Sequence, residues 1–126
     1  MKILIPVDGS DQSNAALDFV ASRSTLIGKD PEVHLLNVQP TLSARVVRAI
    51  GREEAKAYQR AQADDVLRPA MARLKRADIP AKASYVLGNR SDAIGAVAQR
   101  GGSDLIVMGS RGHSGLKGLL FGSMTN

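Results

Sequence analysis

The chain has 126 residues, 44% of them hydrophobic and 23% charged, a balance typical of one globular domain rather than a disordered chain. It has no cysteine, which excludes disulfide scaffolds, thiolate metal sites and cysteine nucleophiles. It has only four aromatic residues, which argues against stacking platforms for single-stranded nucleic acid. The net charge is +5, and its excess lies between Thr41 and Arg76, where nine basic residues face four acidic ones. Because no nucleic-acid motif accompanies this charge, we interpret it as a solvent-facing helix and expect no nucleic-acid partner.

Four segments are predicted to be strands. Lys2–Val7, Glu32–Val38 and Asp104–Met108 are apolar runs rich in Val, Ile and Leu, as in strands buried on both faces of a parallel sheet. Lys82–Leu87 is the fourth and less apolar segment. His34 lies within one of these strands, where we interpret it as a structural residue.

Helical patterns separate these strands. The first runs from about Gln12 to Ile27, with Ser10 as its N-cap and Gly28 at its end. The second occupies much of 42–77, and Pro69 inside it predicts a kink or a restart. The apolar residues of this second pattern that fall near helical spacing are Ala57, Ala61, Leu67, Ala70, Met71 and Leu74.

The third helix is predicted over about Ser91–Arg100, closed by two glycines. The alternation of strands and helices predicts an α/β fold, a doubly wound open parallel sheet, formed by residues 1–126 as a single domain. Only eighteen residues follow Met108, too few for another crossover helix and a parallel strand. We therefore expect either a truncated form or a sheet that ends at a lone edge strand.

The last part of the chain is rich in glycine, with five glycines among residues 109–122. Glycines let a ligand approach the backbone, and successive amides form anion-binding nests. This segment leaves the carboxyl end of a parallel strand, where open α/β sheets bind ligands. We expect a phosphate-bearing ligand. Neither the Walker spacing nor Gly-x-Gly-x-x-Gly occurs, so a P-loop hydrolase and a standard dinucleotide fold are not supported.

One spacing in this segment is similar to that of a known family. Gly109-x-x-Gly112, nine further residues and Gly122-Ser123 resemble the nucleotide signature of the universal stress protein family. The opening segment Ile3–Ser10 resembles that family's first strand and loop, and Leu35–Val38 its second strand. The segment from Asp104 to Gly112 resembles its fourth strand, so the resemblance covers the whole chain in order.

The resemblance implies a Rossmann-like sheet, similar to that of the adenine nucleotide alpha hydrolases, in the strand order 3-2-1-4-5. Because the chain ends early, we expect the order 3-2-1-4 with the fifth strand and the last helix missing. The resemblance also implies a stress-response or regulatory protein, commonly a homodimer, that binds ATP at the switch point between strands one and four. No membrane partner is expected, because the longest charge-free run, Val33 to Ala44, is about half of what a membrane-spanning helix needs. The apolar start is too short for a signal peptide, so we expect a cytoplasmic protein.

Carried over position by position, the resemblance divides the site into two parts. The residues that it places on the adenine and ribose side are Pro6, Val7, Asp8 and Val38. The residues that it places by the ribose and the phosphates are Met108, Gly109, Gly112, Gly122, Ser123, Met124 and Thr125. For Arg111, between two motif glycines, phosphate contact and plain solvent exposure are equally compatible with the sequence.

Three functions remain open at this point. The first is a regulatory module that holds ATP, ADP or AMP without rapid turnover, since the sequence suggests no base with its orienting partner and no two-metal acidic cluster. No catalytic or metal-binding residue is therefore assigned. The second is a slow ATPase or autophosphorylating enzyme, in which Asp8 holds Mg²⁺ and Ser123 or His113 accepts the phosphate. The third is a dimerisation module without nucleotide.

Overall fold

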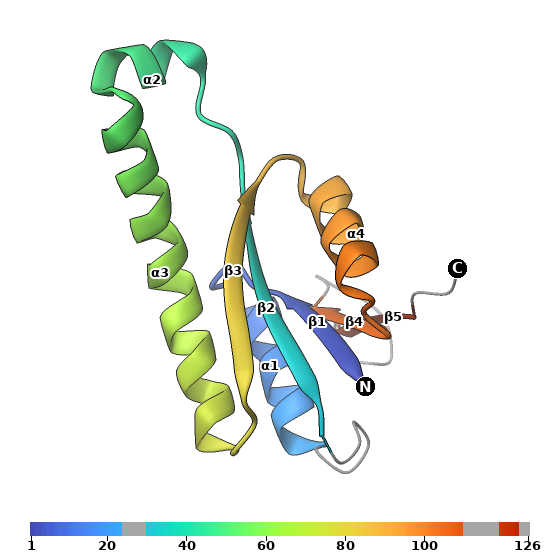
Figure 1. The fold of residues 1–126 in the computed structure, drawn as a ribbon. Coiled ribbons are helices and arrows are strands. Elements are labelled where there is room, and N and C mark those ends of the chain that lie inside the picture. Colours follow the sequence, from blue (N-terminus) through green and yellow to red (C-terminus); the bar gives the residue numbers. More distant parts are fainter. Residues whose placement is uncertain (24–29, 110–118, 124–126) are drawn as a thin grey trace.

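The computed structural model describes residues 1–23 and 30–109, together with the backbone of 119–123. Over these residues the strands form one sheet in the order β3-β2-β1-β4-β5 (Figure 1). The strands are β1 (Lys2–Pro6), β2 (Glu32–Gln39), β3 (Ala81–Leu87), β4 (Leu105–Gly109) and β5 (Leu119–Ser123). The first four are mutually parallel, which confirms the predicted doubly wound sheet with the order 3-2-1-4.

The prediction that a fifth strand is missing needs a correction. β5 pairs with β4 in the antiparallel sense, with Leu119 opposite Gly109 and Ser123 opposite Leu105. Residues 110–118 join the two strands, and a parallel return needs a crossover of a dozen or more residues. So short a connection permits only an antiparallel neighbour, which distinguishes β5 from the parallel fifth strand that the resemblance implied.

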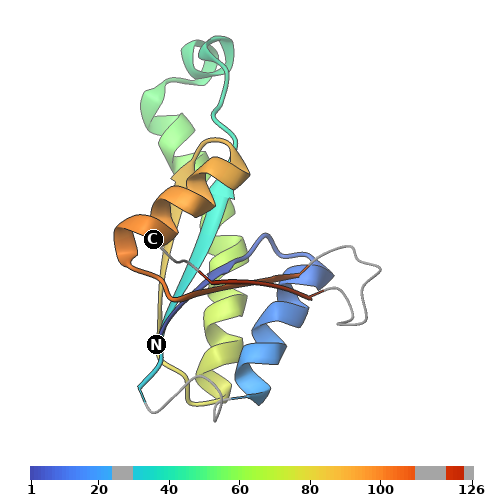
Figure 2. The same cartoon turned by 90° about the vertical axis from the view of Figure 1, so that its right-hand side faces the viewer.

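The helices lie on both faces of the sheet. They are α1 (Asp11–Ser22), α2 (Ala44–Ile50), α3 (Arg52–Arg76) and α4 (Arg90–Gly101). α1 and α3 cover one face, and α4 lies on the other (Figures 1 and 2). α2 lies beyond the carboxyl ends of β2 and β3 and has no buried residue (Figure 1). None of the helices in the described part of the chain is both long and apolar enough to cross a membrane.

α1 begins as predicted but ends earlier. Ser10 is its N-cap, and its hydroxyl oxygen accepts a hydrogen bond of 3.2 Å from a backbone N–H of the first turn. The helix ends at Ser22 rather than at Ile27, and the predicted cap Gly28 lies outside the described residues. At this end the Ser22 hydroxyl donates to the carbonyl oxygen of Phe19. Such local side-chain bonds compete with the helical ladder and favour an end at serine.

The second helical region is interrupted at Gly51, whereas the sequence predicted an interruption at Pro69. Gly51 has φ 91°, a left-handed value that glycine adopts without strain, and it separates α2 from α3. Pro69 lies within the continuous helix α3. Both Pro69 and Asp65, whose carbonyl loses its helical partner there, face solvent, so water can satisfy the freed oxygen.

The buried stripe of α3 starts on other residues than predicted. Its buried positions are Ala55, Gln59, Ala63, Leu67, Ala70 and Leu74. Leu67, Ala70 and Leu74 confirm the prediction, while Ala57 and Ala61 are exposed. A helix this rich in alanine carries a weak amphipathic pattern, so its rotation follows from contact with the sheet and with α1 rather than from its own apolar residues. An Arg73–Asp18 ion pair of 2.7 Å also joins α3 to α1.

The core divides into two clusters, one on each face of the sheet. The larger lies under α1 and α3 and includes Ile3, Ile5, Val33, Leu35 and Val107. The smaller lies under α4 and consists of Leu4, Leu36, Ile94 and Ala98. Alternate residues of β1 and β2 therefore enter opposite clusters, which is why these strands are apolar without a break.

Candidate functional site

The point where the chain reverses its direction across the sheet lies between β1 and β4. At the carboxyl ends of the strands, β1 leads into α1 on one face of the sheet, whereas β3 leads into α4 on the other. These two connections diverge, and the carboxyl ends of β1 and β4 are the usual ligand position in open α/β sheets. A cavity of about 280 Å³ lies there, lined by Pro6, Asp8, Ser10, Gln12, Ser13, Arg90, Met108 and Gly109.

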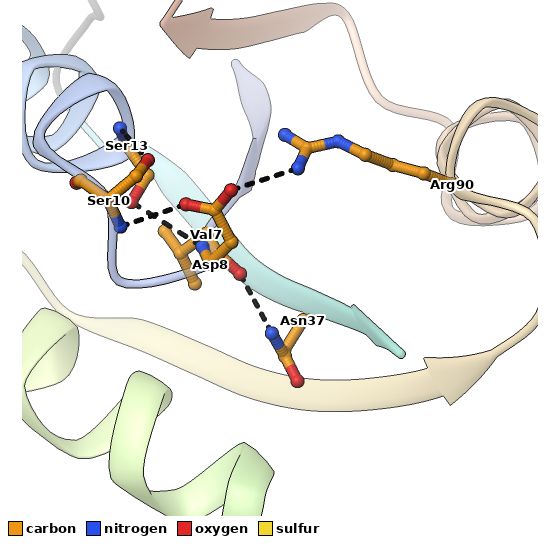
Figure 3. A network of polar contacts seen from close by, with 6 residues as sticks. All are labelled: Val7, Asp8, Ser10, Ser13, Asn37 and Arg90. Atoms are coloured by element: carbon orange, nitrogen blue, oxygen red, sulfur yellow. Dashed lines mark hydrogen bonds and ion pairs between the residues drawn. The ribbon is translucent and has the colours of Figure 1, made fainter. Parts of the chain in front are cut away.

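The loop between β1 and α1 holds Asp8 in a defined orientation. Gly9 has φ 83° and turns the chain sharply after Asp8. One carboxylate oxygen, Oδ1, accepts a hydrogen bond of 2.9 Å from the backbone N–H of Ser10 (Figure 3). The N–H of Asp8 itself donates to the hydroxyl oxygen of Ser13 at 3.4 Å. The first turn of α1 therefore fixes both the backbone and the side chain of Asp8.

A buried polar network supports this loop from below. The N–H of Val7 donates to the carbonyl oxygen of Leu36 at 2.8 Å. The carbonyl oxygen of Val7 accepts a bond of 3.0 Å from the side-chain amide of Asn37 (Figure 3). Asn37 is only 5% exposed, and its own oxygen accepts a bond from Gln39. Buried amides with all partners present rigidify their surroundings, so β2 holds the floor of the site in place.

Arg90 reaches the same carboxylate from the other face of the sheet. It is the first residue of α4, and its Nη1 lies 3.1 Å from Oδ2 of Asp8 (Figure 3). Partial burial opposes the charge of Asp8, but the hydrogen bonds from Ser10 and Arg90 outweigh it and lower its pKa to about 2. Asp8 is therefore a carboxylate at neutral pH, and its two oxygens bind groups from opposite faces of the sheet.

Gly109 closes the wall of the cavity at the end of β4. A Cβ at this position would overlap the backbone carbonyl of Gln12 in the first turn of α1. Only glycine allows β4 and α1 to approach so closely, and this approach shapes the crevice. The glycine that the sequence assigned to ligand contact therefore also has a packing role.

The structure brings together only part of the predicted site. Pro6, Asp8, Met108 and Gly109 line the cavity. Val7 lies beneath it, 3% exposed, and its backbone groups already bond to β2. Val38, at the carboxyl end of β2, packs against the cluster under α4 and does not line the cavity.

The predicted phosphate-binding residues are mostly elsewhere or undescribed. Gly122 lies opposite Ile106 and Ser123 opposite Leu105, at the amino end of β4, whereas the cavity lies at its carboxyl end. The structure therefore does not bring these two residues together with Asp8. The other predicted residues, Arg111, Gly112, Met124 and Thr125, lie outside the described part of the chain.

Four residues that line the cavity were not predicted from the sequence as part of the site: Ser10, Gln12, Ser13 and Arg90. A general rule could have found them. In a parallel sheet, the residues that follow each strand meet at one edge, and Arg90 follows the Gly88-Asn89 turn after β3. Only the strand order reveals that this turn faces the loop after β1.

A larger cavity, of about 400 Å³, lies at the opposite edge of the sheet, where Lys2, His34 and Lys82 line it. The carboxyl end of α4 at Gly101 also borders it, and a helix end of this kind disfavours anions. His34 Nε2 lies 2.6 Å from the hydroxyl oxygen of Ser84. Burial and the charge of Lys82 lower the pKa of His34, and its contact with Ser84 is compatible with the structural role that the sequence predicts.

Metal ligands do not gather in the described part of the molecule, where no three His, Asp or Glu side chains form a group that could hold an ion. In the crevice, Asp8 contributes the carboxylate and Arg90 already occupies one of its oxygens. The charge partner of Asp8 in this structure is therefore a guanidinium.

These features define a doubly wound α/β protein with a polar crevice at the switch point between β1 and β4. The family model for the universal stress protein family matches residues 1–126, and the chain belongs to this family. None of the curated protein sequences matches the chain.

Solved structures share the fold. The structure of the hypothetical protein MJ0577 superposes with a TM-score of 0.71, at 30% identity over 92% of this chain and 78% of that one. A universal stress protein family protein from Arabidopsis thaliana with AMP bound gives 0.60 at 18% identity, over 82% and 72% of the two chains. A universal stress protein in complex with cAMP gives 0.61 at 20% identity, over 86% and 75%.

Proposed function

We propose that this chain is a regulatory universal stress protein that binds an adenine nucleotide in the crevice between β1 and β4. The observation that carries the proposal is the oriented Asp8 carboxylate at the switch point, fixed by Ser10 from one face and Arg90 from the other. Two structures with the same fold contain AMP and cAMP, which supports the same ligand class here. Asp8 provides hydrogen-bond acceptors for the ribose hydroxyl groups of such a ligand.

ATP is the ligand that we propose among the adenine nucleotides, on the strength of the glycine spacing from Gly109 to Ser123. In this proposal Met108 and Gly109 lie by the ribose and the first phosphate, with Gly112 by the later ones. Phosphate binding by Gly122 and Ser123 requires β5 to separate from β4, because both now pair at the far end of that strand. The other proposed contacts are Pro6, Val7, Asp8, Val38, Arg111, Met124 and Thr125.

We further propose that the nucleotide is held rather than rapidly hydrolysed. General bases work best with a pKa near the operating pH, and the pKa of Asp8 is about 2. Asp8 is thus a weak proton acceptor at neutral pH and serves as a binding group. A cytoplasmic homodimer remains the assembly that the family resemblance predicts, and sedimentation velocity of the purified chain tests it.

The direct test is mass spectrometry of the small molecules released when freshly purified protein is denatured. We expect an adenine nucleotide in a stoichiometric amount, and ATP as the species that binds most tightly in calorimetry. If no nucleotide is released, and adenosine, AMP, ADP and ATP all give no binding heat, the chain is not a nucleotide-binding protein. Release of labelled phosphate from γ-labelled ATP, or its transfer to the protein, would identify the slow enzyme instead.

A matched pair of variants locates the site. Asp8→Asn keeps the shape of the side chain but removes its charge, and we expect at least a tenfold loss of ATP affinity. Asp64→Asn removes the same charge from the exposed surface of α3 and should leave the affinity unchanged. Equal affinities for the two variants would place the nucleotide elsewhere on the molecule.

A further inference from the structure

Arg90 is the only positively charged side chain among the described residues that line the crevice, and Asp8 is the only negatively charged one. Their charges cancel, so the described lining of the crevice carries no net charge. Without the guanidinium, this lining would carry one negative charge and would repel a phosphate. Arg90 therefore determines the net charge of the described lining.

The guanidinium of Arg90 has hydrogen-bonding capacity to spare. An arginine side chain carries five N–H donors in a planar fork, and Asp8 is the only side-chain partner of Arg90 within the described residues. The side chain is 46% exposed, so the remaining donors are accessible from the crevice. Such a fork binds phosphate oxygens in pairs and with high geometric preference.

Asp8 does not depend on Arg90 alone for its position. Its Oδ1 accepts the N–H of Ser10 at 2.9 Å, while Arg90 contacts Oδ2 at 3.1 Å. The guanidinium can therefore turn part of its donors towards a ligand while the carboxylate stays in place. Figure 3 shows this arrangement, with Asp8 between Ser10 on one side and Arg90 on the other.

We propose that Arg90 is the residue through which this site prefers phosphorylated nucleosides, by bridging the Asp8 carboxylate and a phosphate of the bound nucleotide. This inference rests on the proposed function. It assigns a role in specificity to a residue of α4, on the face of the sheet opposite α1. In this proposal Asp8 contacts the ribose and Arg90 contacts the phosphate, so the role of Arg90 is confined to the phosphate.

The experiment compares adenosine with AMP by calorimetry on the wild-type chain and on Arg90→Gln. We expect the variant to lose at least tenfold in AMP affinity and to keep its adenosine affinity within twofold. Arg90→Lys keeps the charge but not the planar fork of donors, so its AMP affinity should lie between those of the wild type and Arg90→Gln. Arg90 is half exposed, so all variants should fold, and circular dichroism melts check this.

Arg100→Gln is the matched control. Arg100 is exposed at the other end of α4, and among the described residues its Nε donates only to the backbone of its own helix. It lies about 15 Å from Arg90 along the helix axis. This separation exceeds the Debye length of about 8 Å at physiological salt. The control variant should therefore bind AMP and adenosine like the wild type.

Other results of these binding measurements would contradict the proposed role of Arg90, the proposed function or both. If Arg90→Gln weakens AMP and adenosine equally, Arg90 only positions Asp8, and the proposed role is wrong. If the Asp8→Asn/Arg90→Gln double variant regains the wild-type preference for AMP over adenosine, Arg90 acts by neutralising Asp8 and does not touch phosphate. If the wild type binds neither compound and no other adenine nucleotide, the proposed function fails together with this inference. If the wild type binds AMP and the Arg90→Gln variant binds AMP with the same affinity, this inference is wrong while the proposed function stands.

Discussion

The two faces of the sheet differ in how completely they are covered. On the face of α1 and α3, fourteen buried residues form one continuous cluster. On the face of α4, four buried residues form a smaller cluster, and half-buried or exposed polar residues such as His34 and Lys82 follow on the same strands. The well-covered face therefore supplies most of the stability, while the other is free to carry the adaptable groups, Arg90 among them.

This difference explains how the crevice is built. The well-covered face supplies its rigid wall, because α1 packs directly on Gly109 and its first turn orients Asp8. The open face supplies Arg90, on a helix whose side chains meet fewer buried neighbours. A rigid wall opposite a looser charged group is a suitable arrangement for a site that adjusts to its ligand.

The largest expected effect is on stability, and it should differ between two neighbouring leucines of β2. Leu35 and Leu36 are both fully buried, but they enter opposite clusters. We expect Leu35→Ala to cost about 4 kcal/mol of unfolding free energy and Leu36→Ala about 2–3 kcal/mol, because a looser environment relaxes around the cavity. Urea denaturation of both variants measures the difference, and equal or reversed costs would contradict the contrast between the faces.

Replacing a glycine with alanine should change the free energy of unfolding in opposite directions on the two faces. Gly109→Ala places a Cβ against the backbone of Gln12, and we expect a loss of about 1–3 kcal/mol. Gly95→Ala, within α4, meets nothing within 4 Å and should stabilise by about 0.5–1 kcal/mol, since alanine restores helix propensity. Thermal melts of the two variants give both signs. Stabilisation by Gly109→Ala would show that the wall of the crevice is not tightly packed.

The Asp8–Arg90 ion pair, which connects the two faces, should make the stability of the protein depend on pH in the acid range. The pKa of Asp8 is lowered from 3.8 to about 2, so its contribution to stability is present above pH 3.8 and is lost as the pH falls towards 2. The carboxylate is 41% exposed, and solvent screening limits the contribution to about 1 kcal/mol or less. The stability difference between wild type and Asp8→Asn should shrink over this interval. A difference that stays constant between pH 5 and pH 2 would disagree with a charged Asp8.

The smallest effect concerns His34 on the open face. Its pKa is lowered by burial and by Lys82, so the folded chain favours the neutral ring. Stability from this group is complete above pH 6.5 and falls as the pH drops below that value, because the unfolded chain then binds more protons. We expect the free energy of unfolding to fall by less than about 0.5 kcal/mol by pH 5, and we expect no such fall in His34→Gln. Identical pH profiles of the two proteins would show that His34 is no more covered than a surface histidine.

Much of the fold could be predicted because the signals are local. Three of the four parallel strands, β1, β2 and β4, are mostly apolar runs, and Ser10 carries its own capping signal. The end of α1 and the rotation of α3 could not be predicted in the same way. Serine competes only weakly with the helix, and the alanines of α3 do not distinguish one face from another until the helix meets the sheet.

The candidate site shows the same division. Asp8 and Gly109 could be found from the sequence, since each directly follows or ends a predicted strand. Arg90 could not, because its partner Asp8 is 82 residues away and the two meet only through the strand order. Gly122 and Ser123 show the converse, since a clear sequence spacing does not by itself place them beside Asp8.

The sequence alone determined the alternation of strands and helices, the buried strands and the family to which the chain belongs, because residues near one another in the chain carry these signals. Only the tertiary structure decided which loops meet at the switch point, which charge neutralises Asp8 and which face of the sheet is open. These features depend on contacts between residues far apart in the chain, which form when the strands pair and the helices pack on them.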